Sequence, residues 1–275
     1  MSDSTVIPLV PREGWHVMHL FYQIDHAQWS LFSDEEQRQA KTRLTELVQE
    51  IRATADTHLL IFAIATPKAD LGFMLLTPDL QIANAFEKQL TLSLGPEILA
   101  PVYSYLSQTE GSEYTPTREQ HAAEVLIAEK GLTECTPEFE AALAEFDTRM
   151  AHYLKHRLYP VLPDWPVICF YPMSKRRSGS DNWYSLSFDA RRNLMVGHAR
   201  VGRTYTGRIL QLITGSTGLD EFEWGVTLLA KDTIDIKSIV YEMRFDEVSA
   251  RYADFGDFYI GMQLPLDVLF RRLCL

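Results

Sequence analysis

The feature that most constrains the fold of this sequence is an order of predicted elements that occurs twice. Each copy reads strand, helix, strand, strand, helix, strand, judged from apolar β-branched runs and from apolar residues at helical spacing. The first copy comprises 15–24, 34–52, 58–65, 71–77, 79–92 and 102–109. The second comprises 166–174, 188–205, 208–215, 221–230, 233–243 and 255–264. A chain of 275 residues that repeats its elements in this way has few folds available to it.

The repeated order is that of a ferredoxin-like, or split βαβ, unit. We therefore predict an α+β protein of two ferredoxin-like halves whose antiparallel sheets pack together, as in a dimeric α+β barrel, because packing would bury both apolar sheet faces. The expected N-terminal half is 1–115, the helical connection is 116–160, and the C-terminal half is 161–275. The connection contains two predicted helices, near 117–130 and 137–157.

Charge is distributed unevenly along the chain. The formal net charge of −11 argues against DNA or RNA as a partner, because binding to phosphate polymers needs a basic face. Between residues 155 and 208, however, ten lysines and arginines stand against three acids, which gives this stretch a charge of +7. Such a segment is either a solvated face or a recognition surface for a compact polyanion. An anionic small molecule fits it better than a nucleic acid.

The sequence carries neither a targeting signal nor a conventional metal motif. It begins without a basic or apolar leader and contains no run of about 18 apolar residues, so we expect a cytoplasmic protein with no membrane span. Cys135, Cys169 and Cys274 are far apart and are expected to be free thiols. His152 and His156 have H-x-x-x-H spacing but lack the glutamate of the hydrolytic zinc motif, which favours a solvated helix.

One histidine of the second copy differs from the others. His198 shares the apolar face of the predicted helix 188–205. A lone inward histidine is commonly a core residue with a satisfied hydrogen bond, but an axial histidine facing a broad apolar cavity is also a usual way to hold haem. Gly197 and Gly202 lie on either side of it, each costing about 1 kcal/mol of helix propensity relative to alanine. They would leave room for a flat ligand.

Tyr171 ends the first strand of the same half, and Lys175, Arg176 and Arg177 follow it. One interpretation places the tyrosine at the rim of the sheet with its hydroxyl in water, and the cations on the surface. The other interpretation combines them with His198 in a single site. An iron macrocycle that carries several carboxylates would use a histidine, a tyrosine and cations together. We expect Arg176 and Arg177 to be surface charges under either interpretation.

Several long motifs carry a family resemblance. YPMSKRR, DNWYSL, MVGHARVGRTYTGRILQLITGSTGLDEFEWGVTL and IVYEMRFDEVSARYADFG resemble the chlorite dismutase superfamily, and within it the peroxide-dependent coproheme decarboxylases. The resemblance is dense over 157–265 and weaker over the first half. The segment 122–139 departs from the family pattern.

The resemblance implies a role for individual residues. His198 would be the proximal iron ligand, Tyr171 the catalytic tyrosine, and Lys175 the cation beside the reacting propionate. Gln211 would lie on the distal side, where oxygen-producing chlorite dismutases place an arginine. The further residues implied in binding the substrate are Arg157, Pro172, Met173, Ser174, Trp183, Arg244 and Ser249.

The implied reaction is the oxidative decarboxylation of two propionates of Fe-coproporphyrin III (coproheme) to vinyls, with hydrogen peroxide as oxidant. Coproheme would be both substrate and redox cofactor, and protohaem the product, in the coproporphyrin-dependent route of haem biosynthesis. The resemblance also implies a homo-oligomer, a pentamer in the family, with ferrochelatase as a candidate upstream donor. The alternatives are a chlorite dismutase or peroxidase, and a non-catalytic haem carrier or sensor.

Overall fold

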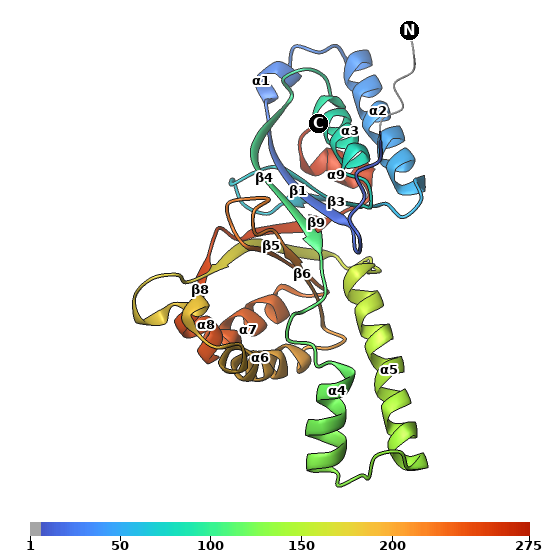
Figure 1. Cartoon of the computed structure of the whole chain (residues 1–275). Helices are drawn as coiled ribbons and strands as arrows, with labels where there is room; N and C mark the ends of the chain where they lie inside the picture. Colours follow the sequence, from blue (N-terminus) through green and yellow to red (C-terminus); the bar gives the residue numbers. More distant parts are fainter. Residues whose placement is uncertain (1–6) are drawn as a thin grey trace. The chain divides into compact units, whose positions relative to one another are not determined.

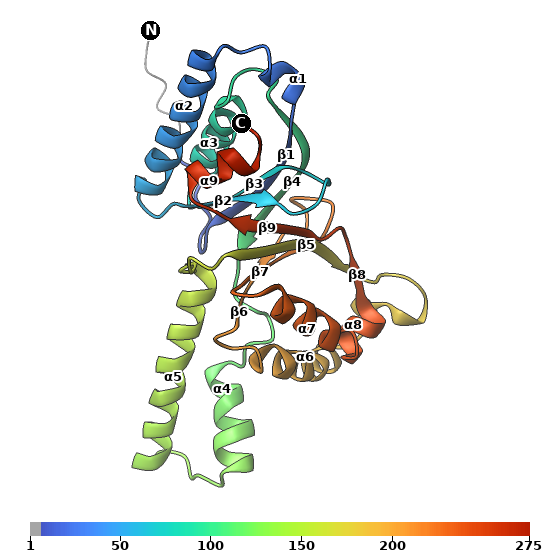
Figure 2. The same ribbon diagram turned by 180° about the vertical axis from the view of Figure 1, so that it is seen from behind.

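The computed structural model describes residues 7–275 and divides the chain into two compact units. Residues up to Thr109 and from Leu162 onward form the first unit, and Glu110–Val161 form the second. Figures 1 and 2 show the chain from two opposite sides. Both ferredoxin-like patterns lie in the first unit.

The two halves of the first unit have the same strand order. In the N-terminal half, β1 (His16–Ile24), β2 (His58–Ile64), β3 (Leu71–Thr77) and β4 (Leu99–Thr109) are arranged as β4-β1-β3-β2. In the C-terminal half, β5 (Val167–Lys175), β6 (Ile209–Gly215), β7 (Trp224–Ala230) and β9 (Tyr259–Gln263) are arranged as β9-β5-β7-β6. All these pairings are antiparallel. The predicted fold class is confirmed.

The two sheets also join at their edges, as in the predicted barrel type, through pairings that the sequence did not specify. β2 pairs with β9 and β4 pairs with β6, so all strands except β8 (Ala253–Phe255) close into one barrel. Closure satisfies backbone groups that an open sheet would expose at its edges. β8 extends the end of β5, with Lys175 opposite Ala253. The predicted strand 255–264 is therefore two strands, β8 and β9.

Side chains alternate between the barrel interior and its outer faces. The interior is an aromatic and aliphatic cluster drawn from both halves, including Phe21, Phe62 and Phe170. Helices α2 (Asp34–Ala53), α3 (Leu80–Leu92) and α9 (Leu266–Arg272) cover the outer face of the N-terminal half (Figure 1). Helices α6 (Phe188–Arg203), α7 (Thr233–Met243) and α8 (Glu247–Tyr252) cover that of the C-terminal half (Figure 2). Neither α8 nor α9 was predicted.

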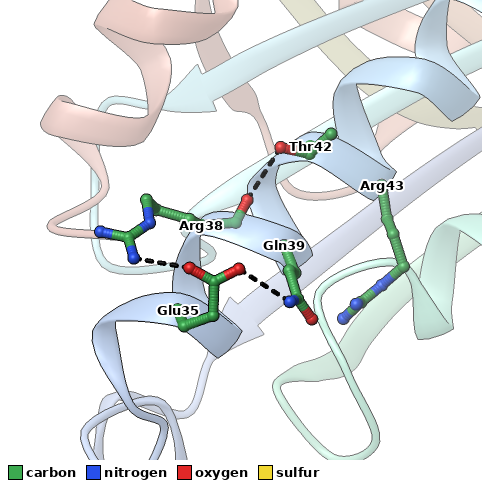
Figure 3. A pocket seen from close by; sticks show the side chains of 5 residues that line it. All are labelled: Glu35, Arg38, Gln39, Thr42 and Arg43. Carbon is green, nitrogen blue, oxygen red and sulfur yellow. Dashed lines mark hydrogen bonds and ion pairs between the residues drawn. The ribbon is translucent and has the colours of Figure 1, made fainter.

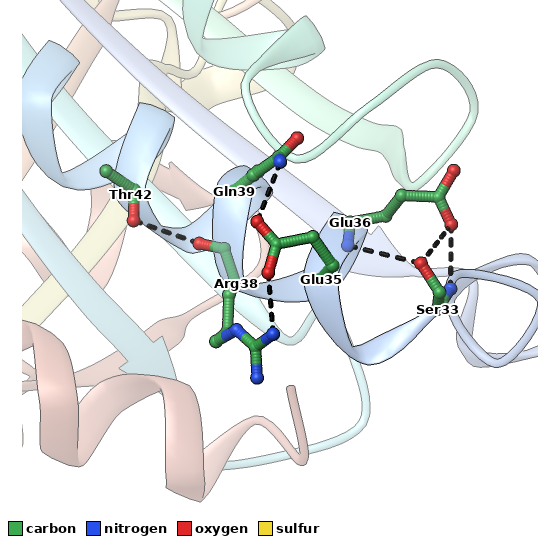
Figure 4. A network of polar contacts seen from close by, with 6 residues as sticks. All are labelled: Ser33, Glu35, Glu36, Arg38, Gln39 and Thr42. Atoms are coloured by element: carbon green, nitrogen blue, oxygen red, sulfur yellow. Dashed lines mark hydrogen bonds and ion pairs between the residues drawn. The ribbon is translucent and has the colours of Figure 1, made fainter.

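Helix α2 is stabilised at its start and along its inner face. Ser33 caps it in a capping box: Glu36 N–H donates to Ser33 Oγ, and Ser33 N–H donates to Glu36 Oε2 at 2.7 Å (Figure 4). The apolar residues of its inner face are fully buried: Ala40, Leu44, Val48 and Ile51. This helix is an ordinary, well-packed layer of the core.

The second unit is helical, as the sequence predicts, but its first helix is divided. α4 (Arg118–His121) continues into a π-helix, η1 (Ala122–Glu129), before α5 (Pro137–Leu158). Leu126, Phe139 and Leu143 form a small core between them. Within the part of the chain that the structure describes, no helix is both long and apolar enough to cross a bilayer.

Candidate functional site

Tyr171 lies on the outer face of β5, beneath the helices of the C-terminal half. Ile168 and Phe170 face the barrel interior, whereas Cys169 and Tyr171 belong to the cluster of the outer face. Tyr171 is 6% exposed, and its ring stacks on Phe258 with centroids 4.3 Å apart. Burial raises the pKa of the phenol above its usual value, so it is protonated at neutral pH. The ring is therefore buried under the helices, whereas the hydroxyl oxygen is not among the fully buried polar atoms that lack a partner within residues 7–275.

Lys175 is a buried cation at the end of the same strand. The residue is 9% exposed, and its Nζ lies 4.7 Å from the centre of the Trp183 ring. Burial lowers the pKa of Lys175 to about 8, although the charges of Asp246 and Glu223 raise it. Within residues 7–275 no hydrogen bond or ion pair reaches its ammonium group. A buried cation without a contacting anion is costly, which makes this position suited to an anionic ligand.

His198 is held by a carboxylate that the sequence analysis did not identify. Its Nδ1 lies 2.8 Å from Asp246 Oδ2, and because a carboxylate accepts, Nδ1 carries the proton and Nε2 keeps a lone pair for a metal. Burial opposes ionisation of Asp246, but hydrogen bonds from His198 and from Ser249 N–H prevail and lower its pKa. Asp246 is also the N-cap of α8, and it lies in the motif IVYEMRFDEVSARYADFG, but nothing in the sequence marks it as the partner of His198.

Gln211 faces the same outer layer from β6. In the ladders, Gln211 and Cys169 both pair with Leu228 of β7, while Tyr171 pairs with Val226. Gln211 and Tyr171 are thus two strands and two residues apart, about 12 Å between Cα atoms. The apolar side chains of β7 lie between them.

The two glycines of α6 have different surroundings. A Cβ at Gly202 would lie 3.0 Å from Gln211 Nε2, so glycine allows α6 to approach β6 closely there. Gln211 Nε2 donates to the Gly202 carbonyl at 3.4 Å. Gly197 is exposed, and a Cβ there would meet nothing within 4 Å. The space beside Gly202 is thus occupied by the Gln211 and Met243 side chains, and room for a flat ligand beside His198 stays a prediction.

Most of the remaining predicted residues surround Tyr171 and Lys175. Pro172, Met173 and Ser174 complete the end of β5, which pairs with β7 and β8. Trp183 is buried beneath Lys175, and the Arg244 guanidinium lies 4.0 Å from the ring centre of Phe255.

Two predicted binding residues lie on other elements. Ser249 is buried in α8, where its N–H binds Asp246. Arg157 belongs to the unit Glu110–Val161 and donates there to the Glu110 carbonyl at 3.3 Å. Its role in binding the substrate stays a prediction.

The two arginines after Lys175 are surface ions, as the sequence predicts. Arg176 pairs with Asp254 at 3.0 Å, and the Arg177 side chain is 68% exposed. The predicted free thiols are likewise observed, because Cys135, Cys169 and Cys274 are all unbridged.

Two other places in the chain lack the properties of a site. His152 and His156 approach each other to 3.1 Å between Nε2 atoms on an exposed face, but no group of three metal-ligating side chains exists within residues 7–275. A surface hollow of about 360 Å³ lies on α2 (Figure 3). Three of its polar side chains satisfy one another, since Glu35 accepts from Arg38 and Gln39. It shares no residue with the cluster around Tyr171.

A closed barrel of two ferredoxin-like halves, with a tyrosine and a lysine under the second helix layer and a histidine on it, defines the structural class. The family model for chlorite dismutase matches residues 37–264, and the chain belongs to this family. It is 37% identical to a novel heme-binding protein from Thermus thermophilus, covering 98% of this chain and 99% of that one, with a TM-score of 0.78. Chlorite dismutase from Candidatus Nitrospira defluvii in complex with imidazole shares the fold at 17% identity, covering 96% and 97% of the two chains, with a TM-score of 0.69.

Proposed function

We propose that this protein catalyses the hydrogen-peroxide-dependent oxidative decarboxylation of two propionates of coproheme, giving protohaem. The observation that carries the proposal is the buried Lys175 ammonium, which has no contacting anion within residues 7–275 and lies on the same strand end as the buried Tyr171. A propionate would supply the missing anion and would lie beside an oxidisable phenol. Lysine and tyrosine at this spacing serve a reaction at a carboxylate side chain better than one at a small inorganic anion.

The residues present fit an iron porphyrin. His198 offers Nε2 to a metal because Asp246 fixes the proton on Nδ1. Val226, Leu228 and Ile213 give an apolar floor on the sheet. The heme-binding protein from Thermus thermophilus, similar over its whole length, supports this fit. When bound, the iron lets peroxide act as a two-electron oxidant.

The reaction balances with one peroxide for each vinyl. A propionate loses carbon dioxide, one hydrogen from its β-carbon and two electrons in total; peroxide accepts the electrons and becomes two waters, with one proton taken up overall. Tyr171 would give up an electron and its phenolic proton, then take back the hydrogen atom from the β-carbon. Its hydroxyl has no hydrogen-bond partner within residues 7–275, so this oxygen is available for that exchange.

Lys175 would position the carboxylate that is lost. An ammonium group held over Trp183 before the substrate arrives needs little reorganisation, and such preorganised charge contributes about a few kcal/mol. Gln211 is neutral, so it offers no cation to hold a chlorite ion. These two residues favour decarboxylation over chlorite chemistry.

Two other functions have specific support and are tested in the same assays. The family model favours chlorite dismutation, which would release oxygen from chlorite. The Thermus thermophilus neighbour favours a heme-binding role, in which Tyr171 would only donate a hydrogen bond to a propionate. A carrier would bind coproheme and leave its mass unchanged in peroxide.

The substitution Tyr171→Phe tests the proposal. The variant should bind coproheme as the wild type does but form no vinyl, as followed by the mass of the porphyrin after addition of peroxide. Tyr241→Phe, at an exposed tyrosine of α7, is the matched control and should react at the wild-type rate. Protohaem formation by Tyr171→Phe at the wild-type rate would remove the tyrosine from the mechanism.

The proposal includes the assembly and supply of substrate implied by the family. We expect a homo-oligomer, a pentamer in the family pattern, which native mass spectrometry can count. Ferrochelatase is the expected donor of coproheme, and transfer from loaded ferrochelatase to this protein can be followed by absorbance.

A further inference from the structure

Glu223 lies immediately before β7 and contacts the end of β5 with both its backbone and its side chain. Its N–H is shared between the Met173 carbonyl at 3.1 Å and Ser174 Oγ at 3.2 Å. Its carboxylate Oε2 accepts from the Lys175 N–H at 2.7 Å. Glu223 therefore contacts three consecutive residues of the strand end that follows Tyr171.

The carboxylate replaces a missing strand partner. The ladder between β5 and β7 ends where Met173 pairs with Trp224, so no β7 residue pairs with Lys175. The backbone of the following residue is held on the opposite side of β5, where the Arg176 N–H donates a hydrogen bond to the Tyr252 carbonyl of α8. A side-chain oxygen thus continues the hydrogen bonding of the strand for one more residue and fixes the backbone of Lys175.

The Glu223 carboxylate is also buried, with its side chain 6% exposed. A buried carboxylate is costly unless it is hydrogen-bonded and compensated by positive charge. Its hydrogen bond comes from the Lys175 backbone, and its nearest ion is Arg177, 3.9 Å away and largely exposed. The Lys175 ammonium supplies further compensation from within the protein.

We infer that Glu223 is a positioning residue, which fixes the backbone of Lys175 and keeps its ammonium charged so that it can receive a carboxylate of the substrate. The inference rests on the proposed function for the identity of that carboxylate. The groups that face the ammonium are Glu223 before β7, Asp246 before α8, and the Trp183 ring of the 3₁₀ turn Trp183–Ser185. Of the two acids, Glu223 alone contacts the lysine backbone; Asp246 binds His198.

Titration of Lys175 in the ligand-free protein tests the inference without any turnover. Protein labelled with ¹³C-lysine is titrated by NMR, and the Lys175 signal is assigned by its loss in Lys175→Met. Glu223→Gln keeps an oxygen for the Lys175 N–H but removes the charge, so the midpoint should fall by about one pH unit. Glu221→Gln, at an exposed acid of the same loop, is the control and should leave the midpoint in place.

The substitution Glu223→Asp separates the effect of the negative charge from the effect of the side-chain length. It retains the carboxylate but is one methylene shorter, so the Lys175 midpoint should stay near that of the wild type while coproheme affinity falls about tenfold. An unchanged midpoint in Glu223→Gln would overturn the inference. So would wild-type coproheme affinity in both variants. A shifted midpoint in a protein that forms no vinyl would instead count against the decarboxylase proposal and leave the role of Glu223 intact.

Discussion

The two halves of the barrel have the same strand order but pack their helices differently. α2, which follows the first strand of the N-terminal half, buries four residues completely against the sheet. α6 occupies the same position in the C-terminal half, and none of its residues, all of which the structure describes, is buried. Its apolar residues Leu194, Met195 and Val201 are only half-buried. The same element is core in one half and covers the candidate site in the other.

The buried tyrosines show the same contrast. Tyr22, on the outer face of β1, is 1% exposed and its hydroxyl is 2.8 Å from Thr91 Oγ1. Tyr171, on the outer face of β5, is similarly buried, but its hydroxyl has no hydrogen bond within residues 7–275. Under the proposed function, one half of the duplicated fold serves stability and polar groups of the other half serve the reaction.

The largest expected effect on stability is in α2. Leu44→Ala removes a fully buried side chain and should lower the free energy of unfolding by about 2–5 kcal/mol, measured by urea denaturation. Coproheme affinity, measured where the variant is fully folded, should be unchanged. A large loss of affinity would show that the halves are not functionally separate.

The next effect concerns Lys175 and depends on pH. Its pKa is about 8 in the folded protein and 10.5 as the reference for the unfolded chain. The unfolded state binds more protons between these values, so stability should rise with pH across this window and be lowest below pH 8. Lys175→Met lacks this penalty and should be more stable than the wild type at neutral pH by about 1–3 kcal/mol, the difference vanishing above pH 10.5.

Denaturation of both proteins at several pH values measures that difference. Lys237→Met, at an exposed lysine of α7, is the control and should follow the wild type throughout. The stabilised Lys175→Met should bind coproheme more weakly, since it lacks the cation for the propionate. Equal stability of wild type and Lys175→Met at all pH values would mean that the buried charge costs nothing.

The smallest effect on stability is expected in α6. Leu194→Ala should lower the free energy of unfolding by less than about 1 kcal/mol, because the side chain is already half-exposed. Calorimetric titration should nevertheless show about tenfold weaker coproheme binding, since the ligand would cover this residue. Val196→Ala, at an exposed position of the same helix, should change neither quantity. A stability loss as large as that of Leu44→Ala would contradict the comparison.

The repeated element order could be predicted from the sequence because the apolar periodicity of a strand or a helix involves residues that are close together in the chain. The particular edge pairings that close the barrel could not, since the pairing of β2 with β9 joins residues about 200 apart and depends on edges that have no sequence pattern of their own. Short elements such as α8 were missed for a similar reason. Six residues carry too little periodicity to be recognised.

The residues of the candidate site likewise fall into those that the sequence identified and those that it did not. Tyr171, Lys175 and His198 could be assigned roles from the resemblance, whose motifs also contain Asp246 and Glu223. Asp246 and Glu223 could not, because the sequence alone favours a solvated charge for an acidic residue in a loop. Only the folded structure shows that Asp246 contacts His198 and that Glu223 contacts the Lys175 backbone. Residues that position a site residue are therefore harder to identify from the sequence than the site residue itself, because their role depends on tertiary contacts.

Under the proposed function, the C-terminal half oxidises a carboxylate side chain of its ligand. The most direct measurement is the mass of the porphyrin after wild-type protein, coproheme and hydrogen peroxide react without oxygen. Two successive decarboxylations are expected, with two peroxides consumed for each protohaem formed. Bound coproheme of unchanged mass, together with oxygen release from chlorite, would contradict the proposed function.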